Sequence, residues 1–419
     1  MVRPPEELTT RRVTRRMPRW SELSPLLQRR KLEVNAVDRR LTRAHTIDDL
    51  RTIARRRTPL SVFDYVDGAA EAELSLARAR AAFSDIEFRP RVLRDVSEVD
   101  TSVDILGTSS ALPLVLAPTG FTRMMHHEGE VAVARAAARA GVPYTLSTMG
   151  TTSIEELRRE VPGGRQWFQL YLWQDRTASE ALIEQAVRAG VDTLMLTVDT
   201  PIGGARLRDV RNGLTIPPTL TPRTLAGMAR HPSWWLNLLT TEPLEFASLH
   251  SWHGTVEQLV ARMFDPRVTF EDLSWLRSRW SGRLVVKGVQ RVDDARRVVD
   301  VGADGVVVSN HGGRQLDRAP APLELLPHVA AAVGDRAEVF VDTGIMSGAD
   351  LVAARALGAT AGMVGRAYLY GLMAGGERGV DRALQLLGDE VARTLRLLGV
   401  TRITEVGPEH AVLRRTWAP

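Results

Sequence analysis

Several residues of this sequence have side chains suited to acid–base chemistry on a charged substrate. His311 and Arg314 follow the apolar run Val306–Asn310, and Asp199 ends an earlier apolar run. An imidazole near a carboxylate forms a general base with an orienting partner. A guanidinium binds a carboxylate through paired hydrogen bonds, so Arg314 and an arginine after Asp199 would suit a substrate carboxylate. These residue types predict proton removal from an anionic substrate.

Lysine is rare in this chain, and its position is therefore informative. Lys31 and Lys287 are the two lysines among 55 basic residues. A lysine kept at the end of an apolar run suggests a role that arginine cannot fill, because an ammonium group is a compact charge with an adjustable pKa. Lys287 would suit a cofactor ring that becomes negative, although a single lysine can also survive by chance.

The elements that must position these residues repeat along the chain. Short apolar, β-branched runs alternate with amphipathic helical stretches, several of which end at a glycine such as Gly141. Eight such units predict an α/β fold, a (β/α)8 TIM barrel. An open doubly wound sheet is the weaker alternative, because no Gly-x-Gly-x-x-Gly follows the first run. The eight runs are Leu114–Ala117, Tyr144–Thr148, Trp167–Tyr171, Leu194–Asp199, Leu284–Gly288, Val306–Asn310, Val339–Gly344 and Met363–Arg366.

Each of the eight runs ends in polar residues or is followed closely by them, as Thr119 follows the first run. Each of them alone has an ordinary explanation, such as a satisfied buried amide for Gln169, but polar groups in a barrel mouth are costly unless they bind something. The carboxyl ends of barrel strands form the active site in such folds. The loops after the last two strands are the customary phosphate site, and Gly344, Gly365 and Arg366 lie there. The set predicts a phosphate-bearing ligand.

Two segments fall outside the regular repeat. Residues 1–45 are rich in arginine and proline and predict a basic, partly ordered arm, which leaves 46–419 for the barrel domain and an N-terminal helical extension that opens at Thr46. Residues 201–269 are too long for one unit and predict an insertion after the fourth strand. Its tryptophans and leucines, among them Trp234 and Trp252, either lie on a membrane surface or pack on the barrel or a neighbouring subunit.

Composition excludes several classes of protein and site. The chain has 419 residues, of which 44% are hydrophobic, and no cysteine, which excludes disulfides, thiolate metal ligands and cysteine nucleophiles. We expect no metal site. Apolar runs long enough to span a membrane and a signal-peptide pattern are both missing, which predicts a cytoplasmic protein. Residues 1–60 hold sixteen Lys and Arg against seven Asp and Glu, but no nucleic-acid module accompanies this charge, so we expect no nucleic-acid partner.

Five motifs together resemble one enzyme family. Ser-Asn-His-Gly-Gly-Arg-Gln-Leu-Asp at Ser309–Asp317 is the most specific of them. Leu-Val-Val-Lys-Gly, Phe-Gln-Leu-Tyr, Leu-Thr-Val-Asp-Thr-Pro and the Phe-Asp-Tyr of Phe63–Tyr65 accompany it. The chain resembles the FMN-dependent α-hydroxy acid dehydrogenases and oxidases from about Thr46 to His410. Within that family it is most similar to bacterial L-lactate dehydrogenases that pass electrons to the respiratory chain.

The resemblance implies a role for each candidate residue. His311 takes the α-proton, or the hydroxyl proton if hydride moves directly, and Asp199 stabilises the imidazolium. Lys287 lies beside the flavin and stabilises its reduced, anionic form. The substrate would be bound by Tyr65, Tyr171, Arg206 and Arg314. The remaining contacts with FMN would come from Thr119, Ser147, Gln169, Thr197, Ser309, Asp342, Gly344, Gly365 and Arg366.

Two positions depart from the family pattern. The family's Asp-Gly-Gly-x-Arg is here Asp342-Thr343-Gly344-Ile345-Met346, so that Met346 replaces a phosphate-binding arginine. Met149 stands where glycolate oxidases carry a bulky tryptophan, which favours lactate over glycolate by the small margin that one methyl group allows.

Several alternatives stay open from the sequence. We expect oxidation of an L-2-hydroxy acid, L-lactate first, with quinone or another respiratory carrier as electron acceptor. The alternatives are oxidation of a larger substrate such as a modified peptide, an oxygen-using oxidase, and a non-catalytic flavin-binding regulator. The last is disfavoured because mere binding needs no base. The resemblance further implies a homotetramer, docked on the inner face of the cell membrane through the arm and the insertion.

Overall fold

A closed barrel of eight parallel strands forms the core of the protein. The computed structural model describes residues 15–27, 33–213, 225, 227, 229–244, 247 and 264–414. Around the barrel the strands follow the order β10-β11-β4-β5-β6-β7-β8-β9, so each strand pairs with its neighbours along the chain and β11 closes on β4. The bounds are β4 Leu114–Leu116, β5 Tyr144–Ser147, β6 Gln166–Leu170, β7 Thr193–Thr197, β8 Arg283–Val289, β9 Gly305–Val308, β10 Glu338–Val341 and β11 Ala361–Val364. The (β/α)8 prediction is confirmed.

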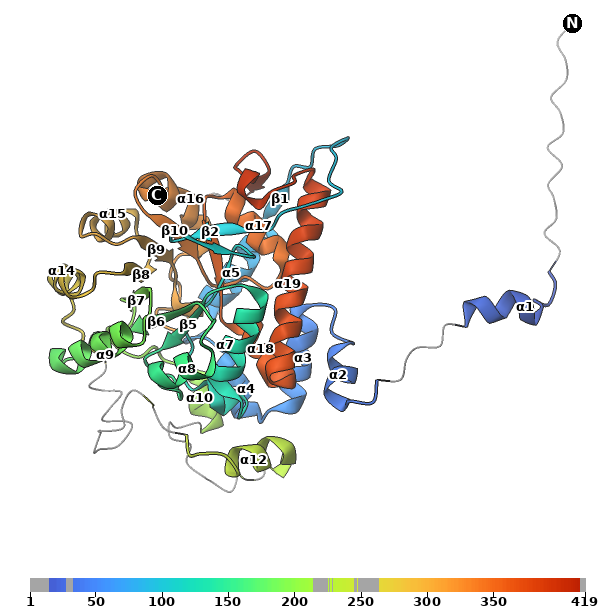
Figure 1. The fold of residues 1–419 in the computed structure, drawn as a ribbon, viewed down its shortest axis with the longest axis horizontal. Coiled ribbons are helices and arrows are strands. Elements are labelled where there is room, and N and C mark those ends of the chain that lie inside the picture. The colour runs from blue at the N-terminus through green and yellow to red at the C-terminus, as the bar shows by residue number, and fades with distance from the viewer. Residues whose placement is uncertain are drawn as a thin grey trace, which may run out of the picture.

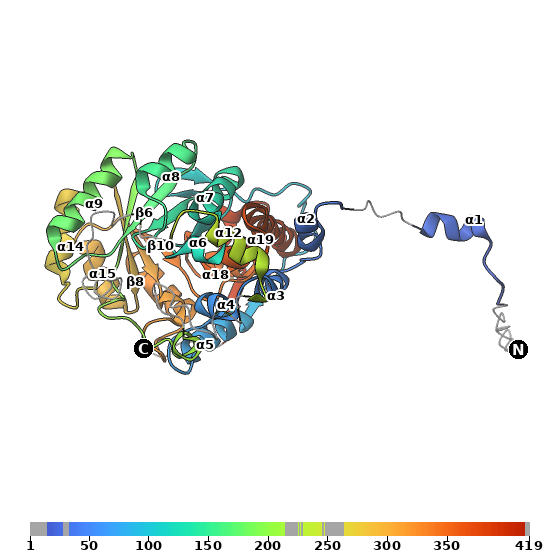
Figure 2. The same ribbon diagram turned by 90° about the horizontal axis from the view of Figure 1, so that it is seen from below.

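Helices surround these strands on the outside (Figures 1 and 2). The strands are buried on both faces, which explains their continuous apolar runs. A left-handed glycine, Gly141, ends α7 and turns the chain into β5, as its position in the sequence predicted. The helices after the strands are α6 Thr122–Met125, α7 Gly129–Ala140, α8 Ile154–Glu160, α9 Arg176–Arg188, α14 Phe270–Arg279, α15 Val292–Asp300, α16 Pro322–Val333, α17 Gly348–Ala356, α18 Arg366–Gly375 and α19 Glu377–Leu398.

Several strands end earlier than the apolar runs suggested. β7 ends at Thr197, β9 at Val308 and β10 at Val341, so Asp199, His311 and Asp342 all lie in the loops that follow. Lys287 differs, because it lies inside β8, where the pairing with β9 shifts between Lys287 and Val289. Asp199, His311 and Asp342 are thus held by loops at one end of the barrel, whereas Ser147, Gln169, Thr197 and Lys287 lie on the strands themselves.

The N-terminal extension packs helices against the end of the chain. Thr46 caps α3 (Ile47–Arg57) in a capping box with Asp49, as predicted. Two further helices follow, α4 (Leu60–Asp67) and α5 (Leu74–Ser84), and α3 lies beside α18. Within the expected arm, α1 (Trp20–Leu23) buries no residue, whereas α2 (Ala36–Leu41) is fastened to α18 by a bond of 2.7 Å from Arg40 Nε to the carbonyl of Ala374.

Small elements complete the described chain. The strand β1 pairs with β12 in antiparallel fashion, and β2 pairs with β3. Their bounds are β1 Ile86–Phe88, β2 Val103–Ile105, β3 Thr108–Ser110 and β12 Ala411–Leu413. Three 3₁₀ turns are η1 Ser24–Leu26, η3 His311–Gly313 and η4 Ile403–Glu405.

The insertion after β7 contributes two described helices, α10 (Leu207–Asn212) and α12 (Pro232–Leu239), at the end of the barrel that also carries α4 (Figure 1). Trp234 is buried, and its Nε1 donates to the carbonyl of Met124 at 3.1 Å. Leu236 and Leu239 point away from the barrel, 62% and 72% exposed. Trp252 lies outside the described residues. No helix in the described part of the chain is long and apolar enough to cross a membrane.

Candidate active site

One cavity of about 670 Å³ gathers most of the predicted site residues at the carboxyl end of the barrel. Twelve of them line it: Tyr65, Thr119, Ser147, Tyr171, Arg206, Lys287, His311, Arg314, Asp342, Gly344, Gly365 and Arg366. Of the other four, Gln169, Thr197 and Ser309 are buried, and the side chain of Asp199 is 2% exposed. Residues that are far apart in the sequence thus meet in a single concave space, as ligand sites do.

His311 and Asp199 form a hydrogen-bonded pair at the cavity wall. The Nδ1 atom of His311 lies 2.8 Å from Oδ1 of Asp199, whose side chain is almost fully buried. Burial by itself would raise the pKa of Asp199, but the charges of His311 and Lys287 outweigh it and hold this pKa below its ordinary value. A Cβ on Gly288, which has φ +105°, would come within 2.6 Å of Asp199 Cγ, so glycine makes room for the carboxylate. Asp199 therefore stays ionised and fixes the imidazole.

The loop after β9 holds His311 in an unusual backbone conformation. Its φ of +60° is in the left-handed region, which costs free energy for a residue other than glycine. Two side chains stabilise the turn. The Oγ of Ser309 accepts the N–H of His311 at 3.0 Å, and Oδ1 of Asn310 accepts the N–H of Gly313 at 3.0 Å. This turn aims the imidazole into the cavity.

Lys287 carries a buried positive charge on the neighbouring strand. Its Nζ lies 3.1 Å from Oδ2 of Asp342 and donates to Oγ of Ser309 at 3.0 Å. Burial favours the neutral amine, but the carboxylates of Asp342 and Asp199 outweigh it and raise the pKa of Lys287. The ammonium therefore remains charged inside the cavity, as a group that faces a developing negative charge must.

Two arginines lie against the ring of Tyr65. The guanidinium carbon of Arg206 is 5.1 Å from the ring centroid and that of Arg314 is 4.8 Å away. Arg314 also donates to the carbonyls of Tyr65 and Gly68. Burial, followed by the like charge of Arg206, lowers the pKa of Arg314 to about 10. Two guanidinium groups brought so close at a cavity wall are suited to an anion, and a carboxylate matches their geometry.

Tyr171 adds a neutral hydroxyl to the same wall. Burial raises the pKa of its phenol, with the charge of Asp199 as the second cause, so the group keeps its proton. Its ring packs edge to face on Phe264 at 5.4 Å between centroids. The hydroxyl is available for a hydrogen bond to a substrate.

Buried polar atoms on β5, β6 and β7 test whether a flavin fits. Oε1 of Gln169 accepts from Oγ of Ser147 at 3.1 Å, whereas Nε2 of Gln169 and Oγ1 of Thr197 have no partner among the described residues. Thr197 pairs with Lys287 across the β7–β8 ladder. Leaving buried donors unpaired is costly, and the carbonyl and N–H groups of a flavin ring supply matching partners. The donor set fits FMN.

At the opposite end of the cavity the fit to a phosphate is less complete. Gly344 and Gly365 allow close backbone approach. Arg366, however, uses Nε and Nη2 to bind the carbonyls of Val66, Gly68 and Gly312 at 2.7–2.9 Å. Its role in fastening α18 to the neighbouring loops was not evident from the sequence, which indicated a charge for a phosphate.

Two positioning residues were missed, although both belong to the Ser309–Asp317 motif. Gln315 joins the loop after β9 to the loop after β7, because its Nε2 donates to the carbonyls of Asp199 and Ile202 and its Oε1 accepts the N–H of Gly204. Asp317 accepts the N–H groups of Ala72 and Ser75 and so holds α5. The signal that could have identified Gln315 and Asp317 was the presence of polar residues inside a highly specific motif.

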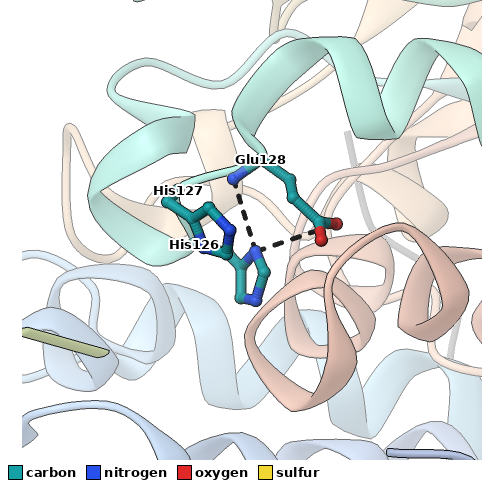
Figure 3. A group of neighbouring side chains, drawn as sticks. All are labelled: His126, His127 and Glu128. Carbon is teal, nitrogen blue, oxygen red and sulfur yellow. Dashed lines mark hydrogen bonds and ion pairs between the residues drawn. The ribbon is translucent and has the colours of Figure 1, made fainter. Parts of the chain in front are cut away.

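A histidine cluster outside the lining of this cavity lies between α6 and α7 (Figure 3). One ligand atom from each of His126, His127 and Glu128 falls within 4.8 Å of the others, and Nδ1 of His126 is 3.9 Å from Oε2 of Glu128. Burial is the main cause that lowers the pKa of His126 to about 3, and the charges of His127, Arg40 and Arg57 add to it. Because these positive charges also oppose a cation, we assign no metal to this cluster.

Comparison with known proteins decides the family. A profile described as FMN-dependent dehydrogenase matches residues 54–413. The chain belongs to the FMN-dependent dehydrogenase family. The "Putative L-lactate dehydrogenase" of Mycobacterium tuberculosis is 59% identical over 407 residues, covering 97% of this chain and 98% of that protein. The L-lactate dehydrogenase of Caulobacter vibrioides is 43% identical over 365 residues, 85% of this chain and 95% of that protein.

Solved structures of the family agree with the fold. The crystal structure of the monotopic membrane protein (S)-mandelate dehydrogenase superposes with a TM-score of 0.85 at 38% identity, covering 88% of this chain and 99% of that chain. Family membership confirms the resemblance, the FMN cofactor and the enzyme class inferred from the motifs. The protein is an FMN-dependent α-hydroxy acid dehydrogenase that acts on a small hydroxy acid.

Proposed function

We propose that this enzyme oxidises L-lactate to pyruvate, with His311 as the catalytic base. The observation that carries the proposal is the meeting, in one cavity, of a histidine fixed by a buried carboxylate and two arginines set against Tyr65. A base and an anion clamp in the same space suit a hydroxy acid, because the carboxylate is held while the neighbouring carbon loses a proton.

Each residue of the site has a defined task in this reaction. Arg206 and Arg314 bind the substrate carboxylate through charge-assisted hydrogen bonds, and Tyr171 contacts the substrate hydroxyl. Because Nδ1 of His311 is bonded to Asp199, Nε2 is the atom that takes the proton. That proton comes from the α-carbon or from the hydroxyl, and both routes remain open.

Electrons and charge also have defined places. When bound, FMN accepts the two electrons that leave the α-carbon. Asp199 stabilises the imidazolium that His311 becomes, at 2.8 Å. Lys287 supplies a fixed positive charge next to Ser309 and Asp342, in a cavity where charge interactions are stronger than in water.

The choice of lactate rests on relatives and on one side chain. The two relatives compared above are named as L-lactate dehydrogenases, and Met149 lines the cavity of this chain. A methionine leaves more space there than a tryptophan and adapts its shape, which suits the methyl group of lactate and tolerates a larger group. (S)-Mandelate is therefore the second candidate, supported by the structural likeness to (S)-mandelate dehydrogenase.

We further propose a quinone as electron acceptor and a peripheral position on the inner face of the membrane. The exposed Leu236 and Leu239 on α12 and the basic N-terminal segment support this, since apolar and cationic groups together favour an anionic lipid surface. A homotetramer remains part of the proposal, to be measured by light scattering.

Anaerobic mixing of the purified protein with L-lactate tests the central proposal. We expect rapid bleaching of the visible flavin band with L-lactate, slower bleaching with glycolate and none with D-lactate. Bleaching by (S)-mandelate alone would replace lactate by an aryl hydroxy acid. Bound flavin that no hydroxy acid bleaches would overturn the proposal and favour a larger substrate.

A further inference from the structure

We propose that Arg80 binds the phosphate of FMN, in place of the arginine that the loop after β10 lacks. The inference rests on the FMN chemistry given above and concerns a residue of α5, a helix that belongs to the N-terminal extension and not to the barrel repeat. In this chain the strand-end motif has Met346 where its charge is expected. The missing charge would then come from another part of the fold.

Arg80 lies at the end of the cavity where the phosphate is expected. It lines the cavity together with Gly344 and Met346. Its Nη1 donates to the carbonyl of Gly344 and lies 3.6 Å from Oδ2 of Asp350. Within the described residues the contacts of the guanidinium run through Nη1, which leaves Nε and Nη2 to donate to a ligand. The side chain is 41% exposed, so a ligand can reach it.

The charge at this end is otherwise low. Arg366, which follows β11 and also lines the cavity, donates through Nε and Nη2 to three backbone carbonyls. A phosphate monoester carries a charge of about −1.5 to −2 near neutral pH, so one partly occupied guanidinium leaves much of it uncompensated. Met346 brings no charge, and Arg80 is placed to bring one.

The fold holds α5, the helix that carries Arg80, against the loop after β10. Asp317 accepts the N–H groups of Ala72 and Ser75 at the start of α5, at 3.2 and 2.8 Å. A Cβ on Gly344 would come within 2.8 Å of the carbonyl of Ala79, which shows how closely α5 approaches the loop after β10. A guanidinium held at a fixed distance from this loop binds a phosphate without a large cost in side-chain order.

A purely structural role for Arg80, in which it only holds the carbonyl of Gly344, predicts a different ligand dependence. Riboflavin has the ring and the ribityl chain of FMN but no phosphate. A contact with phosphate strengthens FMN binding alone, whereas a structural contact affects both ligands equally. The ratio of the two dissociation constants therefore separates the roles.

The experiment measures binding of FMN and of riboflavin to flavin-depleted protein by quenching of flavin fluorescence. The variants are Arg80→Met, Arg80→Lys, Arg80→Met combined with Met346→Arg, and the control Arg78→Met on the exposed side of α5. We expect Arg80→Met to weaken FMN about 10- to 100-fold, as loss of a charge-assisted contact does, and riboflavin less than about twofold. Met346→Arg should restore most of the loss, Arg80→Lys should be intermediate, and Arg78→Met should match wild type.

Equal weakening of FMN and riboflavin, or unchanged FMN binding, would overturn the inference. If flavin-depleted Arg80→Met does not stay folded, the release rates of FMN and riboflavin from the reconstituted variant give the same comparison. Wild-type bleaching by L-lactate is measured separately, so a failed substrate proposal leaves this result readable.

Discussion

The carboxylate of Asp199 holds Nδ1 of His311 at 2.8 Å and directs Nε2 of the ring toward the cavity. The two residues come from loops after β7 and β9, strands that flank β8 on either side. The pair depends on Gly288, since a Cβ at this position would come within 2.6 Å of Asp199 Cγ and displace the carboxylate. In the proposed reaction, a base positioned in this way would take the proton of the bound substrate on Nε2.

Replacing His311 by glutamine should remove nearly all substrate-driven reduction while FMN stays bound. General bases contribute about 10²–10⁴-fold to a rate, and stopped-flow reduction under anaerobic conditions measures that loss. Asp199→Asn should lower the rate less, because the base remains and only its orientation and charge support are lost. Ser309→Ala is a further comparison, since the side chain of Ser309 stabilises the turn at His311. A His311→Gln enzyme that is reduced at the wild-type rate would remove His311 from the mechanism.

Arg314→Met should raise the KM for L-lactate by about a hundredfold, with a smaller effect on flavin content. Hydrogen bonds to charged groups are worth about 1.5–3 kcal/mol each, and the carboxylate would lose this partner. Arg206→Met should act in the same way. Arg211→Met is the matched control, since Arg211 is an exposed residue on α10, the helix that follows Arg206. Steady-state kinetics with an artificial acceptor separate KM from kcat, and an unchanged KM in both variants would contradict the carboxylate clamp.

The sequence could predict the barrel, and which residues meet in its cavity, for a physical reason. Eight buried strands need continuous apolar runs, and ligand-binding groups must follow these runs at the carboxyl ends. Both requirements produce a regular pattern in the sequence. No such pattern identifies Arg80, because its approach to the loop after β10 depends on how α5 packs. The burial of Trp234 and the exposure of Leu236 and Leu239 on α12 likewise depend on tertiary contacts. The sequence pattern fitted a membrane surface and packing on the protein equally well.

Asp67 should stabilise the folded enzyme in a pH-dependent way. Its carboxylate is bonded to Arg51 at 2.5 and 3.0 Å, to Arg208 at 3.0 Å and to Tyr370 at 2.9 Å, which ties α4 to α3, α10 and α18. Burial raises the pKa of Asp67, but the bond to and charge of Arg51, with Tyr370 and Arg208, outweigh it and lower this pKa overall. A lowered folded pKa means that the stabilisation is complete above about pH 4 and is lost as the pH falls through the folded value.

Asp67→Asn should therefore lower the free energy of unfolding at pH 7 by about 2 kcal/mol, and its stability should decline less steeply than that of wild type below pH 4. Urea unfolding, followed by circular dichroism at pH 7 and below pH 4, measures the free energy of unfolding of both proteins. The exposed Asp335 in the turn after α16 provides the control Asp335→Asn. If the free energy of unfolding fell equally steeply below pH 4 in wild type and in Asp67→Asn, the role of this carboxylate would be contradicted.

We expect the exposed leucines of α12 to form the contact between the enzyme and the membrane. Trp234 fastens α12 to α6 through Met124, so Leu236 and Leu239 are presented outward on a fixed helix. Burying a leucine side chain is worth about 1.5–3 kcal/mol, and replacing both by glutamate adds charge repulsion from anionic lipid. We expect the double variant to lose at least about tenfold in binding to vesicles of anionic phospholipid, measured by co-sedimentation, while anaerobic reduction by L-lactate stays unchanged. Val187→Glu is the control, because Val187 is similarly exposed but lies on α9. If wild-type protein does not sediment with these vesicles, or the double variant sediments as well as wild type, α12 is not the membrane contact.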